Sequence, residues 1–353
     1  SIVSPTPSDE RRVEPSECGV NVGGSVTEDA EERRPDILSG SYGRDGGAIV
    51  RSLPNRSLRY FGRIDWQISD NHRLEASYSR LEEDRVLGDA INSGRGEFTF
   101  EDNFQTRGSV SNVYRLALIS DWSDNLSTEI RASRNVVNDS QGPVLGGERQ
   151  ETNVPRLAIG ASFANEFFAQ DFASGPGIFR SANQLDTTVD QFKAKADYVT
   201  GDHTVTVGYE LDSLDVFNLF AINATGTIFF NSIDDLEAGT ARNIRIGASY
   251  SGDIVDAAAA FKRKVHSLYI QYEWQFSDNL LLTGGIRYDF YKSDDNPISN
   301  PVFNAKFGFD NVQAYDGLSA FQPRIGLVYN LPGQFGETTI TAGFATFSGG
   351  DPT

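Results

Sequence analysis

The stretch LRYFGRIDWQISDNHRLEASYS, residues 58–79, decides the fold class of the chain. Up to Ile68, apolar residues occupy every second position, and mostly polar residues stand between them. After Ser69-Asp70-Asn71 the alternation resumes over residues 74–78. Because successive side chains of a strand point to opposite faces, this period of two predicts strands whose faces meet different environments. The short polar tripeptide between the two runs predicts a tight β-hairpin turn.

This hairpin unit recurs along the chain. Ser-Asp-Asn returns at residues 123–125 and 277–279, and Gly201-Asp202-His203 is a looser version of it. An acidic residue followed by an aromatic one stands shortly before each turn: Asp65-Trp66, Asp121-Trp122, Asp197-Tyr198 and Glu273-Trp274. Asp and Asn tolerate left-handed backbone conformations, so we expect the Ser-Asp-Asn turns to close without glycine. A fifth hairpin is expected to turn at Pro332-Gly333-Gln334.

The strand lengths and the asymmetry of the connections favour a membrane barrel. The alternating runs predict about ten strands of roughly ten residues each, the length that a tilted strand needs to cross a bilayer. Short turns join the strands at one end, whereas long polar segments join them at the other: 84–111, 137–188, 213–262 and 292–320. This asymmetry is typical of outer-membrane barrels, and loops of this length are uncommon in compact soluble domains.

We therefore predict an all-β chain, in which residues 58–353 form part of a transmembrane antiparallel up-and-down β-barrel and the four long segments are extracellular loops. Residues 1–57, rich in Pro, Gly, Glu and Arg, are expected to be an extracellular loop or a partly disordered segment. A row of aromatic residues near the short turns supports a membrane interface. Its members are Trp66, Trp122, Tyr198, Trp274 and Tyr329. A soluble β-sandwich or solenoid also alternates and is the alternative.

Composition limits the partners and the context. The chain has 353 residues, 49 of them acidic and 31 basic, and its net charge of -18 argues against nucleic acid as a partner. The single Cys18 excludes an internal disulfide framework. The sequence contains no Met and no visible N-terminal signal peptide, and residues 348–353 resemble an interrupted loop. We therefore expect the chain to be a fragment of a longer protein.

Several short stretches carry a resemblance to a known family. YGRDGG at 42–47, followed by FGRIDW at 61–66 and SDNHRL at 69–74, is similar to the first clear barrel hairpin of the TonB-dependent outer-membrane receptors, in particular their Oar-like subgroup. Other stretches resemble later parts of the same barrel: ANQLD at 182–186, GDHT at 201–204, FNLF at 217–220, FNSIDDLEAG at 230–239 and FATFSGGDP at 344–352. The resemblance extends from about residue 37 to the end of the chain.

The resemblance implies a 22-stranded barrel in the bacterial outer membrane, with a plug in its lumen and a short box that recruits the energy-transducing partner TonB. Ligand binding outside, outer-membrane lipid and lipopolysaccharide around the wall, and TonB acting through the plug are what it implies about partners. The chain departs from this pattern, because about ten strands cannot close such a barrel and no plug is visible. Ser1-Ile2-Val3-Ser4-Pro5-Thr6 is not a convincing TonB box. The ligand is not identified.

No catalytic, cofactor-binding or metal site is predicted, and no ligand-binding residue is assigned. His72, His203 and His266 have no Cys or second His at ligand spacing, which argues against zinc. Neither a Gly-x-Ser-x-Gly nucleophile elbow nor a phosphate-binding loop occurs, so we do not expect an enzyme. Asp234-Asp235 and Asp294-Asp295 lack the EF-hand spacing and are expected to be solvated loops. Residues 232–239 predict a short helix that Ser232 caps and Gly239 ends, chiefly a loop stiffener.

Charged residues in the strands share one face. They are expected to point into the lumen, toward a plug or water, and to pair across strands. They are Arg63, Asp65, Glu75, Arg115, Asp121, Glu129, Arg131, Lys193, Lys195, Asp197, Glu210, Glu273, Arg287 and Asp289. Three functions remain open at this point: a TonB-dependent receptor that moves a ligand across the outer membrane, a surface protein for adhesion or protein export on the same barrel, or a soluble β-rich binding module.

Overall fold

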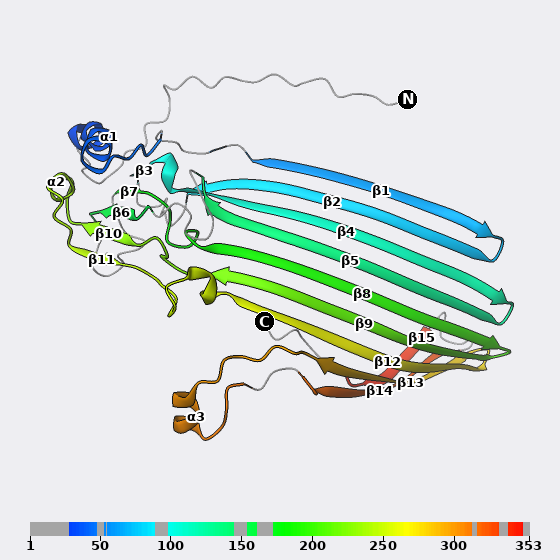
Figure 1. The fold of residues 1–353 in the computed structure, drawn as a ribbon. Helices are drawn as coiled ribbons and strands as arrows, with labels where there is room; N and C mark the ends of the chain where they lie inside the picture. The colour runs from blue at the N-terminus through cyan, green and yellow to red at the C-terminus, as the bar shows by residue number, and fades with distance from the viewer. Residues whose placement is uncertain are drawn as a thin grey trace, which may run out of the picture.

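The computed structural model describes residues 28–47, 53, 55–88, 98–144, 154–160, 172–312, 316–331 and 338–348. Ten strands form one antiparallel sheet, in the order β1-β2-β4-β5-β8-β9-β12-β13-β14-β15 (Figure 1). Their bounds are β1 Arg56–Ser69, β2 His72–Gly88, β4 Phe104–Ser123, β5 Leu126–Pro143, β8 Asn183–Thr200, β9 His203–Phe220, β12 Ala259–Ser277, β13 Leu280–Lys292, β14 Ser319–Leu331 and β15 Thr338–Ala345. Each strand pairs with the next one along the sheet, so the up-and-down wall of a partial barrel is confirmed.

The predicted turns close the hairpins, but by a different backbone route. Each Ser-Asp-Asn hairpin has a register shift just before its turn, at Gln67/Ser69, Asp121/Ser123 and Gln275/Ser277. These turns close without glycine, as expected, but none of their Asp or Asn residues has a positive φ, so they do not use the left-handed conformation that these residues tolerate. In the β8–β9 hairpin, Gly201 has a φ of 55° and no register shift occurs. A bulge therefore replaces the glycine where the turn lacks one.

The turns also bind the neighbouring hairpin. The carbonyl of Asn71 accepts a hydrogen bond of 2.8 Å from the backbone N–H of Asp121, and that of Asn125 accepts one of 2.8 Å from Val199. The same contact joins Asp202 to Gln275 at 2.8 Å and Asn279 to Asn330 at 2.8 Å. Each turn thus lies beside the strand residue that precedes the next turn, and the repeated tripeptide keeps the hairpins in register.

The strands are longer than the sequence predicts. In the ten-stranded sheet, β4 has 20 residues and β12 has 19, and only β15, with 8, is shorter than ten. The loop boundaries 84–111, 137–188, 213–262 and 292–320 were therefore too wide: β2 continues to Gly88, and β4 begins at Phe104. Beyond the apolar region both faces of a strand are polar, so the alternation disappears although the ladder continues. Pairs such as Arg59–Glu83, 2.7 Å apart, join the strands there.

A second, smaller sheet lies at the end of the wall where the long loops are, here called the loop end (Figure 1). It has five strands in the order β11-β10-β6-β7-β3, and β10–β6 and β3–β7 are parallel pairs. Two helices, α1 (Glu28–Tyr42) and α2 (Ile233–Glu237), adjoin it. Its strands are β3 Phe98–Thr99, β6 Arg156–Ile159, β7 Phe172–Ser174, β10 Thr227–Phe230 and β11 Asn243–Arg245. We call this sheet and its two helices the loop module.

The loop module has a hydrophobic core of its own. The buried residues come from segments far apart in the sequence: Ile37, Leu38, Phe100, Leu157, Ile159, Phe172, Phe230 and Leu236. The sequence did not predict it. Residues 28–42, expected as loop or disorder, form α1, and Tyr42 donates a hydrogen bond of 2.7 Å to the carbonyl of Leu236. Each contributing segment is too short to show a periodicity of its own.

Three further elements complete the described chain: the short helical turns η2 (Glu101–Asn103) and η3 (Ile254–Ala257), and the helix α3 (Pro301–Phe307). No helix in the described ranges has the length and apolar character to span a membrane. Cys18, residues 1–6, the expected turn at 332–334 and residues 349–353 lie outside the part that the structure describes.

Candidate functional site: the polar face of the wall

The two faces of the wall have opposite character. One, the apolar face, presents large hydrophobic side chains to the outside: Ile64 is 70% exposed, Trp66 58% and Trp122 59%. A soluble monomer rarely exposes so large an apolar area, whereas lipid covers such a surface without cost. The other, the polar face, carries the charged side chains predicted from the alternation. The pairing register places all of them on this face.

One row across the polar face shows how the charges are arranged. Its residues stand opposite one another from strand to strand: Asp65, Glu75, Ala117, Arg131, Lys193, Glu210, Ser267 and Asp289. Acidic residues occupy the β1–β2 part of this row, basic residues the β5–β8 part, and acidic residues again β9 and β13. Opposite charges face one another at Lys193 and Glu210, a favourable cross-strand arrangement.

A network around Arg287 occupies the β9–β13 side. Its guanidinium lies 2.6 Å from Glu210 and 2.8 Å from Asp289, and it donates a hydrogen bond of 2.7 Å to the hydroxyl of Ser267. Asp289 also accepts from Gln322 at 2.5 Å. Arginine presents its donors in a rigid planar fork, so a single side chain holds three strands in register.

A second network lies on the β1–β2 side. Arg63 contacts Asp65 at 2.7 Å and Glu75 at 3.4 Å, and Arg73 contacts Glu75 at 2.6 Å. These side chains are open to solvent, so the pairs contribute little to stability. The main effect of both networks is to position charged groups on the wall; their contribution to the stability of the wall is smaller.

Between the two networks lies a recess of about 790 Å³. Six basic side chains and three acidic ones line it: Arg63, Arg115, Arg131, Lys193, Arg263 and Arg287, against Glu75, Glu210 and Asp212. Arg115 and Lys193 have no ion pair within the described residues. A chain of net charge -18 thus carries a locally basic recess. The sequence predicted the face of these residues but not the recess, since its lining comes from eight strands.

A glycine shapes the wall beside this recess. Gly208 stands directly opposite Tyr269, and a Cβ at Gly208 would overlap the ring of Tyr269. The guanidinium of Arg287 lies 5.9 Å from the centroid of the same ring, within the range of a cation–π contact. The absent side chain at Gly208 therefore lets Tyr269 lie across β9, where it contacts the central arginine of the network.

A separate buried cluster joins the segments of the loop module. Asp102 lies 3.3 Å from Arg44 and accepts a hydrogen bond of 2.7 Å from the hydroxyl of Ser174. Arg44 also donates to the carbonyl of Pro155 at 2.9 Å. Burial raises the pKa of the Asp102 carboxyl and lowers the pKa of the Arg44 guanidinium. The cluster holds four distant segments together, which is a structural role.

The three histidines lie with aromatic residues of the wall and not with metal-ligating groups. His203 Nδ1 is 2.6 Å from the hydroxyl of Tyr272, His266 Nδ1 is 2.7 Å from that of Tyr209, and the ring of His72 lies 5.0 Å from that of Trp122. Across the described ranges, no three His, Cys, Asp or Glu side chains are grouped to hold a metal ion. The sequence placed these histidines near turns and strand starts but did not show their aromatic partners.

The predicted short helix at residues 232–239 is present as α2. The hydroxyl of Ser232 accepts a hydrogen bond of 3.1 Å from the backbone N–H of Asp235, and Gly239 has a φ of 67°. Both ends match the capping prediction. Leu236 is buried in the core of the loop module, so the helix stiffens this module.

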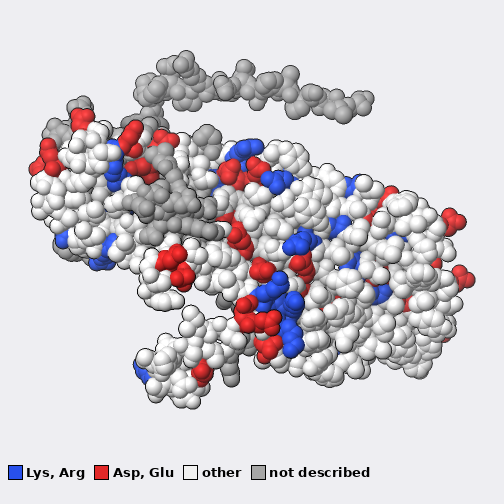
Figure 2. Space-filling view, in the orientation of Figure 1, with Lys and Arg blue, Asp and Glu red and all other residues white. Residues whose placement is uncertain are grey.

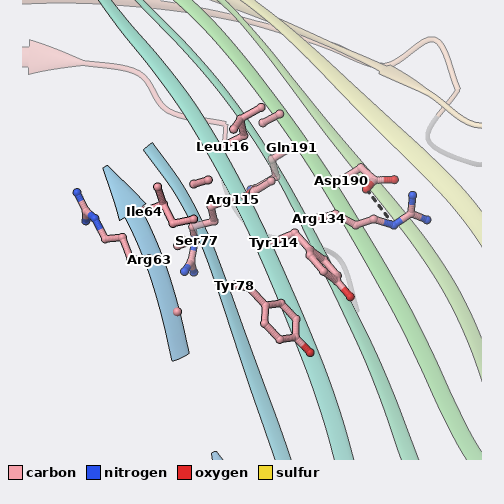
Figure 3. Close-up of a pocket in the computed structure, with 14 residues that line it drawn as sticks. Arg63, Ile64, Ser77, Tyr78, Tyr114, Arg115, Leu116, Arg134, Asp190 and Gln191 are labelled. Carbon is pink, nitrogen blue, oxygen red and sulfur yellow. Dashed lines mark hydrogen bonds and ion pairs between the residues drawn. The ribbon is translucent and has the colours of Figure 1, made fainter. Parts of the chain in front are cut away.

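The apolar face changes to a charged one toward the loop end. A hollow of about 790 Å³ lies on this face. Its lining includes Tyr78 and Tyr114, which lie side by side, and Arg134 and Asp190, which continue the same row across β5 and β8 (Figure 3). The two tyrosine rings are 5.0 Å apart, and Arg134 Nε is 3.6 Å from Asp190 Oδ1. Aromatic rings beside charged side chains are typical of the border of a lipid-facing band.

Comparison with known proteins agrees with this geometry. A family model described as an outer membrane beta barrel domain matches residues 45–353. No curated protein matches the chain. Similar solved structures include the siderophore receptor PirA from Pseudomonas aeruginosa, at 10% identity and a TM-score of 0.45, covering 82% of this chain and 33% of that one. The alcaligin outer membrane receptor FauA from Bordetella pertussis gives 11% and 0.46, covering 78% and 33%. The copper transporter OprC gives 11% and 0.47, covering 82% and 36%. The chain thus spans about a third of the length of these proteins.

Proposed function

The chain belongs to the outer membrane β-barrel domain family and lies in the bacterial outer membrane, and we propose that it is a wall section of a TonB-dependent receptor of the Oar-like kind. In this proposal the full protein binds a ligand outside the cell and moves it across the outer membrane. The basic recess on the polar face is the observation that carries it. A wall that only anchored a surface domain would have no need of unpaired cations facing the lumen.

The proposal also gives the wall an orientation. The hairpin turns lie at the periplasmic side, and the long loops with the loop module lie outside. Trp66, Trp122 and Trp274 then lie at the inner lipid interface, and lipopolysaccharide surrounds the loop end. In the full protein TonB acts through a plug, and Arg115 and Lys193 face either that plug or the passing ligand.

A second function, adhesion or protein export on the same barrel, is favoured by one observation. The loop module has a buried core and a five-stranded sheet, which simple pore loops do not need. Such a module presents a stable surface to another protein. Membership in the barrel family removes the soluble binding module from the alternatives.

The test compares three bacterial strains: the parent, one lacking the gene for the full protein, and one lacking TonB. Mass spectrometry follows the disappearance of components from the culture medium. Transport predicts at least one component that is depleted by the parent and by neither mutant. If the gene deletion leaves depletion unchanged and instead abolishes surface attachment or secretion, the adhesion or export function is correct.

A further inference from the structure

Three exposed lysines gather on the apolar face at the loop end of β12 and β13. Lys264 stands directly opposite Lys292 in the register, and Lys262 precedes Lys264 by two residues in β12. Both β12 lysines are in phase with His266 and Trp274, which belong to the apolar face. The three ammonium groups therefore project on the side that meets lipid and away from the lumen.

Aromatic side chains lie directly below these lysines. His266 stacks on Phe290 with ring centroids 4.8 Å apart, and Tyr209 hydrogen-bonds His266 at 2.7 Å. Amphipathic rings of this kind favour the boundary between hydrocarbon and headgroups. The lysines come immediately beyond this boundary on the same surface.

The spacing along β12 places the lysines at headgroup level. Ten residues separate Trp274, near the turn, from Lys264. At about 3.3 Å per residue this is roughly 33 Å of strand, which a tilt of 35–45° shortens to about 25 Å along the membrane normal. The apolar band of such barrels is about 25 Å tall. Lys264 therefore lies where the band ends and phosphate groups begin.

The lysines of this cluster are available to bind an anion. Lys262 Nζ lies 3.2 Å from Asp215 and Lys292 Nζ 3.7 Å from Asp316, but all four side chains are half-exposed and such pairs are weak. Lys264 has no ion pair within the described residues. Like charges directly opposite one another destabilise an antiparallel pair. An external anion between Lys264 and Lys292 removes that repulsion.

One further acidic side chain, Asp295, lies beside the cluster. It accepts a hydrogen bond of 2.5 Å from the backbone N–H of Lys262 and has no ion pair with a lysine within the described residues. Figure 2 shows Lys and Arg side chains gathered with Asp and Glu across the middle of the sheet, and smaller separate patches of charge from there toward the turns. In this view, charge is thus densest across the middle of the sheet.

We propose that Lys264 and Lys292, assisted by Lys262, bind a phosphate group of lipopolysaccharide in the outer leaflet. The acyl chains of that molecule lie against Tyr209, His266 and Phe290, which continue into the lipid-facing band. This continuity selects a lipid phosphate over free phosphate, since only the lipid also covers the aromatic surface. The site rests on the orientation given under the proposed function but not on the transported ligand.

The experiment uses the full protein, purified from outer membranes in detergent, as wild type, K264Q/K292Q, K264R/K292R and K306Q. The last variant removes an exposed lysine on α3, away from the cluster, and is the matched control. Rebinding of bisphosphorylated lipid A is measured by native mass spectrometry. At about tenfold for each 1.4 kcal/mol and about 1 kcal/mol per lysine near an anionic surface, K264Q/K292Q should bind ten- to thirtyfold more weakly. The arginine and K306Q variants should bind as wild type does.

Dephosphorylated lipid A and inorganic phosphate are the two further arms. Weak binding of the dephosphorylated lipid, and no displacement by millimolar inorganic phosphate, support a lipid-phosphate site. Equal binding by K264Q/K292Q, equal binding of dephosphorylated lipid A, or full displacement by inorganic phosphate would each overturn it. Depletion of medium components by strains carrying the same variants reports transport separately, so failure of the lipid site is distinguishable from failure of the receptor function.

Discussion

The ten-stranded wall and the five-stranded loop module of this chain are stabilised in opposite ways. In the wall, the largest apolar side chains point outward, and Ile64 is 70% exposed. In the loop module they point inward, and Phe230 is 2% exposed. Both regions are β-sheets of one chain. Backbone pairing and the surrounding lipid therefore hold the wall, whereas a core that excludes water holds the module.

Truncating one Phe in each region should give the largest difference in stability between the two regions. Phe230→Ala empties part of the core of the loop module and should cost it about 3–5 kcal/mol. Phe344→Ala, at a wall position that is 67% exposed, creates no cavity inside the protein. Hydrogen exchange of the full protein should show faster exchange at β6, β7 and β10 in the first variant only. Unchanged exchange in Phe230→Ala would mean that the module has no cooperative core.

The second effect tests which face of the wall meets lipid. Ile64→Lys places a charge in the lipid-facing band and should destabilise the barrel by about 2–4 kcal/mol, depending on depth. Ser77→Lys, a neighbouring position on the polar face, should change stability much less because water reaches that face. Denaturant unfolding in lipid vesicles, followed by heat-modifiable gel migration, measures both. Equal destabilisation by the two variants would contradict the assignment of the faces.

The third effect concerns the close approach of Tyr269 to β9. Gly208→Ala forces the Tyr269 ring to move and should cost about 1–3 kcal/mol, because added atoms overfill the space. Gly62→Ala is the control, since a Cβ there meets nothing within 4 Å. The same unfolding measurement applies. A Gly208→Ala barrel as stable as the Gly62→Ala barrel would show that Tyr269 rotates away freely.

The fourth and smallest effect is a pH dependence confined to the loop module. Burial raises the pKa of Asp102 in the folded module above its unfolded value. The stabilisation from its protonated form is therefore fully present below the unfolded pKa, and it is lost as the pH rises through the folded pKa. Protease resistance of the module should fall over that acidic interval, while migration of the barrel stays constant. Asp102→Asn should remove this dependence, and a slope that persists in the variant would assign it to another group.

The sequence predicted the wall well because a strand whose two faces meet different environments alternates apolar and polar residues. Leu58 to Ile68 and Leu74 to Tyr78 gave the faces, and the Ser-Asp-Asn repeats gave the turns. The strand ends were missed for the same reason. Above the lipid band both faces meet water, so residues such as Glu82 and Glu83 carry no alternation although they are paired in β2.

The candidate site was only half predictable. Alternation assigned Arg115, Arg131 and Lys193 to the polar face, because the face of a strand residue depends only on whether its position along the strand is odd or even. Which of them meet in a recess, and which lack an ion pair, depends on registers between strands that are distant in the sequence. The loop module was not predictable at all, since Ile37, Phe172 and Phe230 come together from separate segments that have no periodic pattern.

The alternation and the turn residues alone predict a barrel wall with its turns at one end, because period-two alternation and turn chemistry are local properties. The folded structure adds that the long loops build a second sheet, that a bulge shapes the Ser-Asp-Asn turns, and that Lys264 stands opposite Lys292. Those facts depend on pairing between residues far apart in the chain, which no local pattern specifies.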